Sequence, residues 1–137
     1  MSRILIDTNV FVYRIDEDST YYSRAKRLLD QREKELTTTS KNILEFLTVV
    51  TKPSGYNLDT RLALEIAREI IQNVDIIYPT QESMEILFEL THQYSPSGLK
   101  IHDFEIISIG LAHGIDEVAT FNTKDFDAVK EIALLQL

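Results

Sequence analysis

The sequence predicts an α/β fold, a three-layer sandwich in which helices flank a mostly parallel central sheet. Short apolar runs alternate along the chain with segments of helical periodicity. Residues 4–6, the clearest of these runs, lack the polar–apolar alternation of a half-exposed strand and therefore suit a strand buried on both faces. The clearest turn clusters, at residues 52–55 and 95–98, are too short to be linkers, so we expect one domain over residues 1–137.

The first half of the chain contains two predicted strands and three predicted helices. In order, these are a strand at residues 3–7, a helix at 21–33, a strand at 36–39, a helix that begins at Ser40 and ends before 52–55, and a helix at 58–74. The last of these helices is the most regular, because apolar residues recur every four positions from Leu62 to Val74. Ser40 suits the start of the preceding helix, since its hydroxyl can accept a hydrogen bond from a free backbone N–H.

The second half continues the alternation of strands and helices. In order, we predict a strand at residues 74–78, a helix at about 82–94, a helix at 103–113, a strand at 117–121 and a last strand at 132–137. Pro79 ends the first of these strands, and Gly114 suits the end of the second helix. In a sheet of this kind, functional side chains gather beyond the carboxyl ends of the strands.

Composition and charge narrow the class of protein. Of the 137 residues, 44% are hydrophobic, which is enough for a sizeable core, and 14 basic against 22 acidic residues give a net charge of −8. That charge argues against a general nucleic-acid coat protein but not against a nuclease whose acidic site holds cations. The absence of cysteine excludes disulfides and thiolate chemistry. Apolar runs are far shorter than the ~20 residues that span a bilayer, and no secretory signal precedes Ile4, so we expect a cytoplasmic protein that does not insert in membranes.

Two aspartates stand at the ends of predicted elements. Asp7 follows the first strand, and it either belongs to a functional site or only caps the helix that follows. Asp103 lies in phase with Ile107 and Gly110, on the apolar side of its helix. A buried carboxylate there needs compensation, which a bound cation can supply. The alternative is that Asp103 is simply the N-cap of this helix.

Further polar side chains are candidates for the same site. Glu45 projects away from the apolar stripe of its helix, and it either faces the crevice or is an ordinary solvated residue. Asn122 and Asp125 follow a late strand, where they either join the site or only form a turn. Together these carboxylates suit Mg²⁺, which prefers oxygen ligands and can activate water for phosphodiester hydrolysis. The three histidines have no metal-site spacing, and we expect them to be structural or surface residues.

Three strings of residues carry a resemblance to a known family. They are Ile-Leu-Ile-Asp-Thr-Asn at 4–9, Gly-Leu-Lys-Ile-His-Asp-Phe-Glu-Ile-Ile at 98–107, and Ala-Thr-Phe-Asn-Thr-Lys-Asp-Phe at 119–126. With the less distinctive Ser-Lys-Asn-Ile-Leu-Glu-Phe at 40–46, their order and spacing resemble the PIN-domain ribonucleases. More narrowly, the chain resembles VapC-type toxins of prokaryotic toxin–antitoxin pairs over essentially its whole length.

The resemblance implies a metal-dependent endoribonuclease that cuts structured RNA. By this analogy, Asp7 and Asp103 bind Mg²⁺ or Mn²⁺ directly, and Glu45 completes the acidic set and helps to position or deprotonate the water. Asn122 stands where the family often has a fourth acid, which leaves the second metal ion open, and Asp125 either compensates or shapes the turn. The resemblance further implies a homodimer and a cognate antitoxin with a segment that blocks the crevice. The alternative is a catalytically silent PIN-like module that binds RNA or protein.

An RNA substrate requires local positive charge, because the net charge of the chain opposes a polyanion. Five basic residues lie close together on or near one predicted helix: Arg24, Lys26, Arg27, Arg32 and Lys34. They either form an RNA-binding patch or a solvated face balanced by neighbouring acids. Two other metal-dependent classes are excluded. The haloacid-dehalogenase phosphatases require a second Asp where Asn9 stands, and receiver domains require a phospho-acceptor Asp after a middle strand, which residues 77–80 lack.

Overall fold

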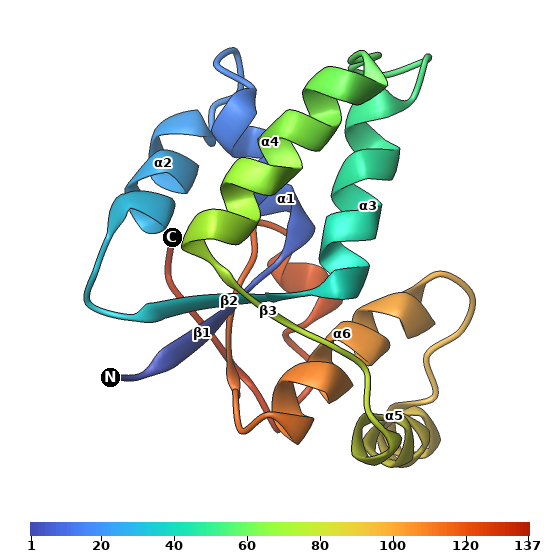
Figure 1. Cartoon of the computed structure of the whole chain (residues 1–137). Coiled ribbons are helices and arrows are strands. Elements are labelled where there is room, and N and C mark those ends of the chain that lie inside the picture. Colours follow the sequence, from blue (N-terminus) through green and yellow to red (C-terminus); the bar gives the residue numbers. More distant parts are fainter.

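The computed structural model describes residues 1–137 and has six helices around one five-stranded sheet (Figure 1). The strands are β1 (Arg3–Ile6), β2 (Glu35–Thr39), β3 (Asp75–Ile77), β4 (Glu117–Ala119) and β5 (Ala133–Leu134). The α-helices are α1 (Thr8–Ile15), α2 (Tyr22–Asp30), α3 (Ser40–Thr51), α4 (Thr60–Asn73), α5 (Gln81–Tyr94) and α6 (Lys100–Ala112). A single 3-10 turn, Thr123–Asp125, follows β4. No helix combines the length and the apolar character needed to cross a bilayer.

The sheet has the strand order β3-β2-β1-β4-β5, and every neighbouring pair is parallel. The prediction of a mostly parallel α/β sheet is therefore confirmed. β1 occupies the centre of the sheet, with β2 and then β3 on one side and β4 and then β5 on the other. Ligand sites of such sheets lie at the carboxyl ends of the strands where the order reverses, which here is the end of β1.

Helices cover both faces of the sheet, which makes the three layers that the sequence predicts. Helices α1 to α4 lie on one face and α5 and α6 on the other (Figure 1). Side chains of β1 alternate between the two sides: Ile4 and Ile6 belong to the core under α1 to α4, while Leu5 packs with Ile106 and Ile109 of α6. The continuous apolar run at the start of the chain is thus explained by burial on both faces.

All predicted strands and helices occur, but several of their ends differ. The clearest difference is α6, which begins at Lys100 and not at residue 103. Gly98 has a positive φ of 61°, and its carbonyl accepts a hydrogen bond from the backbone N–H of Ile101, so the helical turn starts directly after the glycine. Asp103 therefore lies inside the first turn, and the alternative that it is the N-cap is wrong. The late strands are also shorter than predicted.

Close approach of α6 to β1 depends on Gly110. A Cβ atom at this position would lie 3.0 Å from Cδ2 of Leu5 and 3.3 Å from the carbonyl oxygen of Ile115. Those contacts are tighter than normal packing, so a hydrogen atom at this point lets the helix lie directly on the central strand. The same packing sets where the beginning of α6, with Asp103, stands relative to the end of β1.

We expect Gly110→Ala to lower the free energy of unfolding by about 1 kcal/mol. Overpacking costs roughly 1–3 kcal/mol, and the better helix propensity of alanine returns up to about 1 kcal/mol. Urea denaturation measures the change. Gly55→Ala is the matched control, because the nearest atom to its added Cβ is 3.7 Å away, and it should change stability little. A Gly110→Ala variant as stable as the wild type would contradict this account of the packing.

Candidate active site

Asp7 lies at the junction between the central strand and α1. Its backbone N–H donates to the carbonyl of Ala119 at 3.0 Å, which continues the pairing of β1 with β4. Its carboxylate accepts hydrogen bonds of 2.8 Å from the backbone N–H of Thr8 and from the hydroxyl of Thr120. Asp7 is therefore the N-cap of α1, as one alternative held, and it is also anchored to the end of β4.

Two asparagines complete the surroundings of the Asp7 carboxylate. Asn42 is fully buried near the start of α3, and its Oδ1 atom accepts a hydrogen bond of 2.7 Å from the Thr39 hydroxyl. Its Nδ2 atom consequently points to Oδ1 of Asp7 at 3.4 Å and to Oγ1 of Thr8 at 2.9 Å. Asn9 lies on the other side and donates to Oδ2 of Asp7 at 3.4 Å. These partners come from α1, α3 and the end of β4, so the carboxylate has a defined orientation.

The environment of Asp7 favours its protonated form. Burial raises the pKa of Asp7 to about 6, against the hydrogen bonds from Thr120 and Thr8, which lower it. The negative charges of Glu45 and Asp125 raise the pKa further. The Asp7 carboxylate is thus held in one orientation but is costly to ionise, and a cation bound beside it would stabilise its ionised form.

Asp103 lies on the wall of an open hollow of about 370 Å³, close enough to Asp7 for the charge of one to act on the other. The residues that line this hollow, called the acidic pocket below, are Glu45, Leu99, Lys100, His102, Asp103 and Asp125. Partial burial raises the pKa of Asp103 to about 6, and the charges of Asp7, Asp125 and Glu45 contribute in that order. Lys100 acts in the opposite direction but less strongly. The structure thus brings together four of the acids that the sequence singles out.

Glu45, Asp125 and Asn122 are placed differently. Glu45 is exposed on α3 and also lines the acidic pocket. It therefore faces the crevice, as one alternative held, and is solvated, as the other held. Asp125, at the end of the 3-10 turn, is half-buried in the same wall. Asn122 is exposed and does not line the pocket; its backbone N–H donates to Thr120 Oγ1, and its carbonyl accepts from the N–H of Asp125. The fourth acidic side chain is therefore supplied by Asp125.

Thr120, Asn42 and His102 are site residues that the sequence analysis does not single out by role. Thr120 and Asn42 are buried, and they contact Asp7 from 113 and 35 positions away in the chain. Their neighbourhood gives the only signal, since Thr120 precedes Asn122 and Asn42 lies three residues before Glu45. His102 is a surface residue, as predicted, but it also lines the acidic pocket.

The donor set suits a hard divalent cation. Carboxylate oxygens are the ligands that such cations prefer, and a positive charge placed among the carboxylates relieves their mutual repulsion. No three Asp, Glu or His side chains are arranged to hold one ion together. A metal ion at this site would accordingly take few protein ligands and several waters, which is the usual coordination of Mg²⁺.

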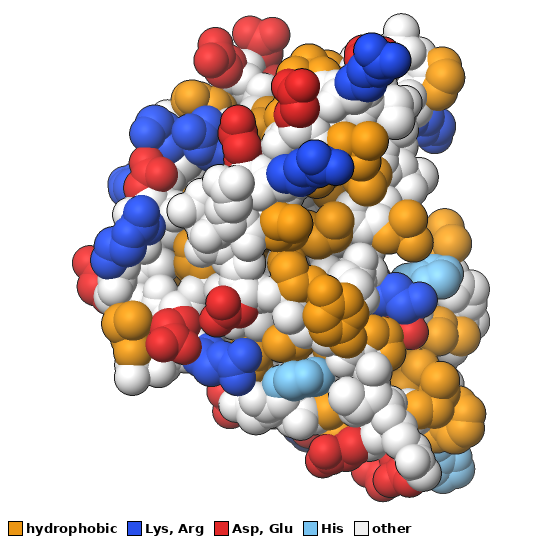
Figure 2. All heavy atoms as spheres, viewed as in Figure 1, with side chains coloured by type: hydrophobic (Ala, Val, Ile, Leu, Met, Phe, Trp, Pro, Cys, Tyr) orange, Lys and Arg blue, Asp and Glu red, His pale blue; other side chains and the backbone are white.

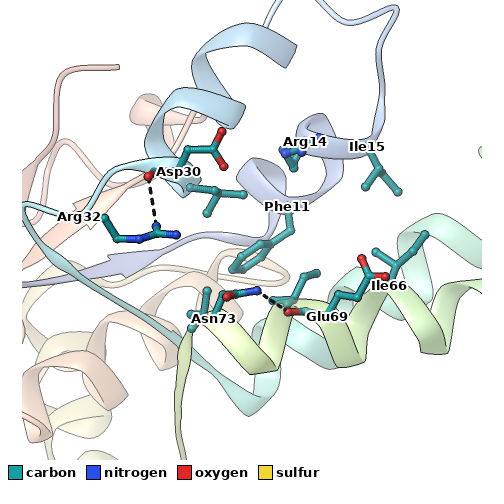
Figure 3. Close-up of a pocket in the computed structure, with 11 residues that line it drawn as sticks. Phe11, Arg14, Ile15, Asp30, Arg32, Ile66, Glu69 and Asn73 are labelled. Carbon is teal, nitrogen blue, oxygen red and sulfur yellow. Dashed lines mark hydrogen bonds between the residues drawn. The ribbon is translucent and has the colours of Figure 1, made fainter.

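A second hollow lies away from the acids, between α1, α2 and α4 (Figure 3). It has a volume of about 300 Å³, and Phe11, Ile66 and Ile70 are among its apolar walls. Arg14, Arg32 and Glu69 lie at its border. Its lining shares no residue with the acidic pocket, so it is separate from the candidate active site.

Comparison with known proteins identifies the family. The model of the PIN domain family matches residues 4–132, nearly the whole chain. The chain belongs to the PIN domain family. The PIN domain match includes all the acids of the acidic pocket, and no curated protein matches the chain in sequence.

Solved structures of toxin–antitoxin proteins share the fold of this PIN domain. A chain of VapBC2 from Rickettsia felis, bound to a DNA fragment from their promoter, has a TM-score of 0.74 at 20% identity, with 98% of each chain covered. VapBC-1 from nontypeable Haemophilus influenzae has a TM-score of 0.72 at 15% identity, over 97% of this chain and 96% of that one. VapC20 from Mycobacterium tuberculosis, a sarcin–ricin loop cleaving toxin, has a TM-score of 0.72 at 17% identity, over 92% of this chain and 95% of that one.

The raised pKa of Asp7 predicts an unusual pH dependence of stability in the absence of metal. Between about pH 4 and pH 6 the folded protein holds a proton on Asp7 that the unfolded chain releases. Stability contributed by this group is therefore present at low pH and is lost as pH rises through about 6. The unfolding free energy of the wild type should fall across this window, and we expect Asp7→Asn to make that fall smaller by ~3 kcal/mol.

Urea denaturation in EDTA, at a pH on each side of the window, measures this difference. Asp18→Asn, at an exposed position in the loop after α1, is the matched control and should show the wild-type pH dependence. If Asp7→Asn also keeps the wild-type pH dependence, Asp7 does not titrate as described.

Proposed function

We propose that this PIN domain is a metal-dependent endoribonuclease and the toxin of a toxin–antitoxin pair. The convergence of Asp7, Glu45, Asp103 and Asp125 at the carboxyl end of the central strand carries the proposal. Burial, and then repulsion from the other acids, raises the pKa of both Asp7 and Asp103, which is the electrostatic condition that a cation relieves. Membership of the PIN family, and the toxin–antitoxin proteins among its structural neighbours, support the choice of nuclease.

Asp7 and Asp103 are the residues that we assign to binding of Mg²⁺ or Mn²⁺. Asp7 is oriented by Thr120 and Thr8, and Asp103 reaches the same space from the first turn of α6. The bound ion would lower the pKa of an attacking water and neutralise the negative charge that develops on the phosphate. Two carboxylates fixed on different elements can fulfil this role only while α6 stays packed on β1.

The other residues of the pocket act directly on water and substrate. Glu45, exposed on the pocket wall, is placed to orient the attacking water and to accept its proton. Lys100 is the cation of the wall, and its ammonium can bind a phosphate oxygen. Asp125 adds negative charge that strengthens cation binding. Hydrolysis then forms a bond between the water oxygen and phosphorus and breaks the bond between phosphorus and the ribose oxygen, which leaves with a proton from solvent.

RNA is the substrate class that we carry over from the structural neighbours. VapC20 is a sarcin–ricin loop cleaving toxin, and its fold matches this chain over nearly its full length. The net charge of −8 means that RNA must bind through local cations and metal, because the protein as a whole repels it.

An antitoxin and a second copy of the chain are the proposed protein partners. Neighbouring structures are of VapBC complexes, which supports an antitoxin. Several large apolar side chains are exposed, among them Leu99 (83%), Phe88 (67%) and Leu44 (61%). Figure 2 shows hydrophobic side chains gathered in the centre and lower right of one face, where α5 lies. Such exposed apolar surface is typical of proteins that bind partners.

We expect the purified protein to cleave transfer or ribosomal RNA with Mg²⁺ or Mn²⁺ and not with EDTA. Asp103→Asn should reduce the cleavage rate at least ~100-fold, because it removes a charged ligand of the ion. It should also weaken Mn²⁺ binding in calorimetry, and raise the thermal stability of the metal-free protein by relieving repulsion. Asp7→Asn, prepared in parallel, controls for contaminating ribonuclease. Metal-dependent cleavage that persists in both variants would show that the assignment is wrong; a wild type without cleavage would favour the binding module.

Asp125 and Asn122 should differ in their effect on activity. We expect Asp125→Ala to lower the cleavage rate about tenfold and to raise the Mn²⁺ concentration needed for half-maximal rate, since it removes charge from the pocket wall. Asn122→Ala, a neighbouring change outside the pocket, should leave both quantities near the wild-type values. Equal effects of the two variants would mean that Asp125 only shapes the turn.

A further inference from the structure

One positive side chain lies on a group of aromatic rings beside the candidate active site. The guanidinium of Arg24, in the first turn of α2, lies 4.8 Å from the ring centroid of Tyr21 and 5.6 Å from that of Phe121. The rings of Tyr21 and Phe121 are themselves 4.6 Å apart, and Tyr13 packs against both. Attraction between the cation and the ring faces holds the guanidinium in place without an acidic partner.

The aromatic rings are joined to the segment that orients Asp7. Phe121 follows Thr120, whose hydroxyl donates to the Asp7 carboxylate at 2.8 Å. The backbone N–H of Phe121 donates to Oδ1 of Asn9 at 3.2 Å, and Asn9 in turn donates to Thr120 Oγ1 at 3.1 Å. Arg24 therefore contacts Phe121, the residue next to the threonine that orients Asp7.

Arg24 differs in its contacts from the other bases of the predicted patch. Lys26 pairs with Asp30 at 2.8 Å, Lys34 pairs with Glu117, and Arg32 donates to backbone carbonyls. The alternative of a face balanced by acids is thus right for Lys26 and Lys34. The side chains of Arg24 and Arg27 form neither a salt bridge nor a hydrogen bond, but of the two only Arg24 lies on aromatic rings, so its N–H donors are both available to a ligand and held in place.

We propose that Arg24 binds a backbone phosphate of the RNA substrate, an inference that rests on the proposed function. A guanidinium presents a planar fork of donors that matches two phosphate oxygens. Stacking on Tyr21 and Phe121 restricts the side chain before binding, so less conformational freedom is lost when the phosphate arrives. A cation without an acidic partner at this point would also attract RNA locally, although the chain as a whole has a net charge of −8.

The experiment measures binding of fluorescein-labelled transfer RNA by anisotropy in EDTA, over a range of NaCl concentrations. We expect Arg24→Ala to weaken binding about tenfold and to reduce the slope of log affinity against log salt by about one. Arg27→Ala is the matched control, because Arg27 is exposed on the same helix and has no aromatic partner; its slope should stay near that of the wild type. Arg24→Lys keeps the charge but not the planar fork, and should restore the slope while affinity stays below the wild type.

Three outcomes would overturn the inference: an unchanged slope in Arg24→Ala, an equal loss in Arg27→Ala, or a wild type that does not bind the RNA. The first of these would direct attention to an acidic segment of a protein partner as the ligand of Arg24. Thermal melts of each variant separate lost binding from lost folding, and Arg24→Lys provides a second, more conservative change.

Failure of this inference is distinguishable from failure of the proposed function. If the wild type cleaves transfer RNA with Mn²⁺ while Arg24→Ala binds it normally, only the role of Arg24 is wrong. If the wild type binds RNA with the Arg24-dependent slope but never cleaves it, the phosphate site stands and the nuclease assignment is wrong.

Discussion

Burial of the Asp7 carboxylate among other acids, at the end of the central strand, is the constraint on which the rest of this structure depends. Asp7 is the most enclosed of these acids, and its pKa of about 6 reflects the cost of ionising it there. Hydrogen bonds from Thr120 and from the N–H of Thr8 offset part of that cost and hold the carboxylate in one orientation. The fold thus tolerates an acid in a place where the charged form is unfavourable, and a divalent cation would convert this local cost into binding energy.

The parallel sheet explains why acids so distant in sequence meet. β1 is the central strand, and the strands on both sides run in the same direction, so the segments after β1, β2 and β4 emerge at one edge. Asp7, Glu45 and Asp125 belong to those three segments. Asp103 comes from the opposite layer, on α6. This helix can lie directly on Leu5 because Gly110 has no side chain. The site therefore depends on packing in both layers of helices.

Much of this arrangement could be predicted from sequence, and the remainder has physical reasons. Apolar periodicity correctly predicts the five strands and five of the six α-helices, because burial on one or two faces imposes it, whereas α1 enters only as the helix that Asp7 caps. The predicted start of α6 at residue 103 is wrong, because the turn at Gly98, with its positive φ, starts the helix at Lys100. The contacts of Thr120 and Asn42 with Asp7 leave no periodic pattern, since they join residues far apart in the chain. Likewise, the ion pair of Lys34 with Glu117 is invisible in a local reading of the basic patch.

Direct location of the cation tests the central claim. Crystals soaked in Mn²⁺ would be measured near the manganese absorption edge, and an anomalous difference map would show where the ion binds. The account requires a peak between the carboxylates of Asp7 and Asp103, and the loss of that peak in crystals of Asp103→Asn. A wild-type map with no peak at these carboxylates, or with manganese bound only elsewhere on the surface, would contradict it.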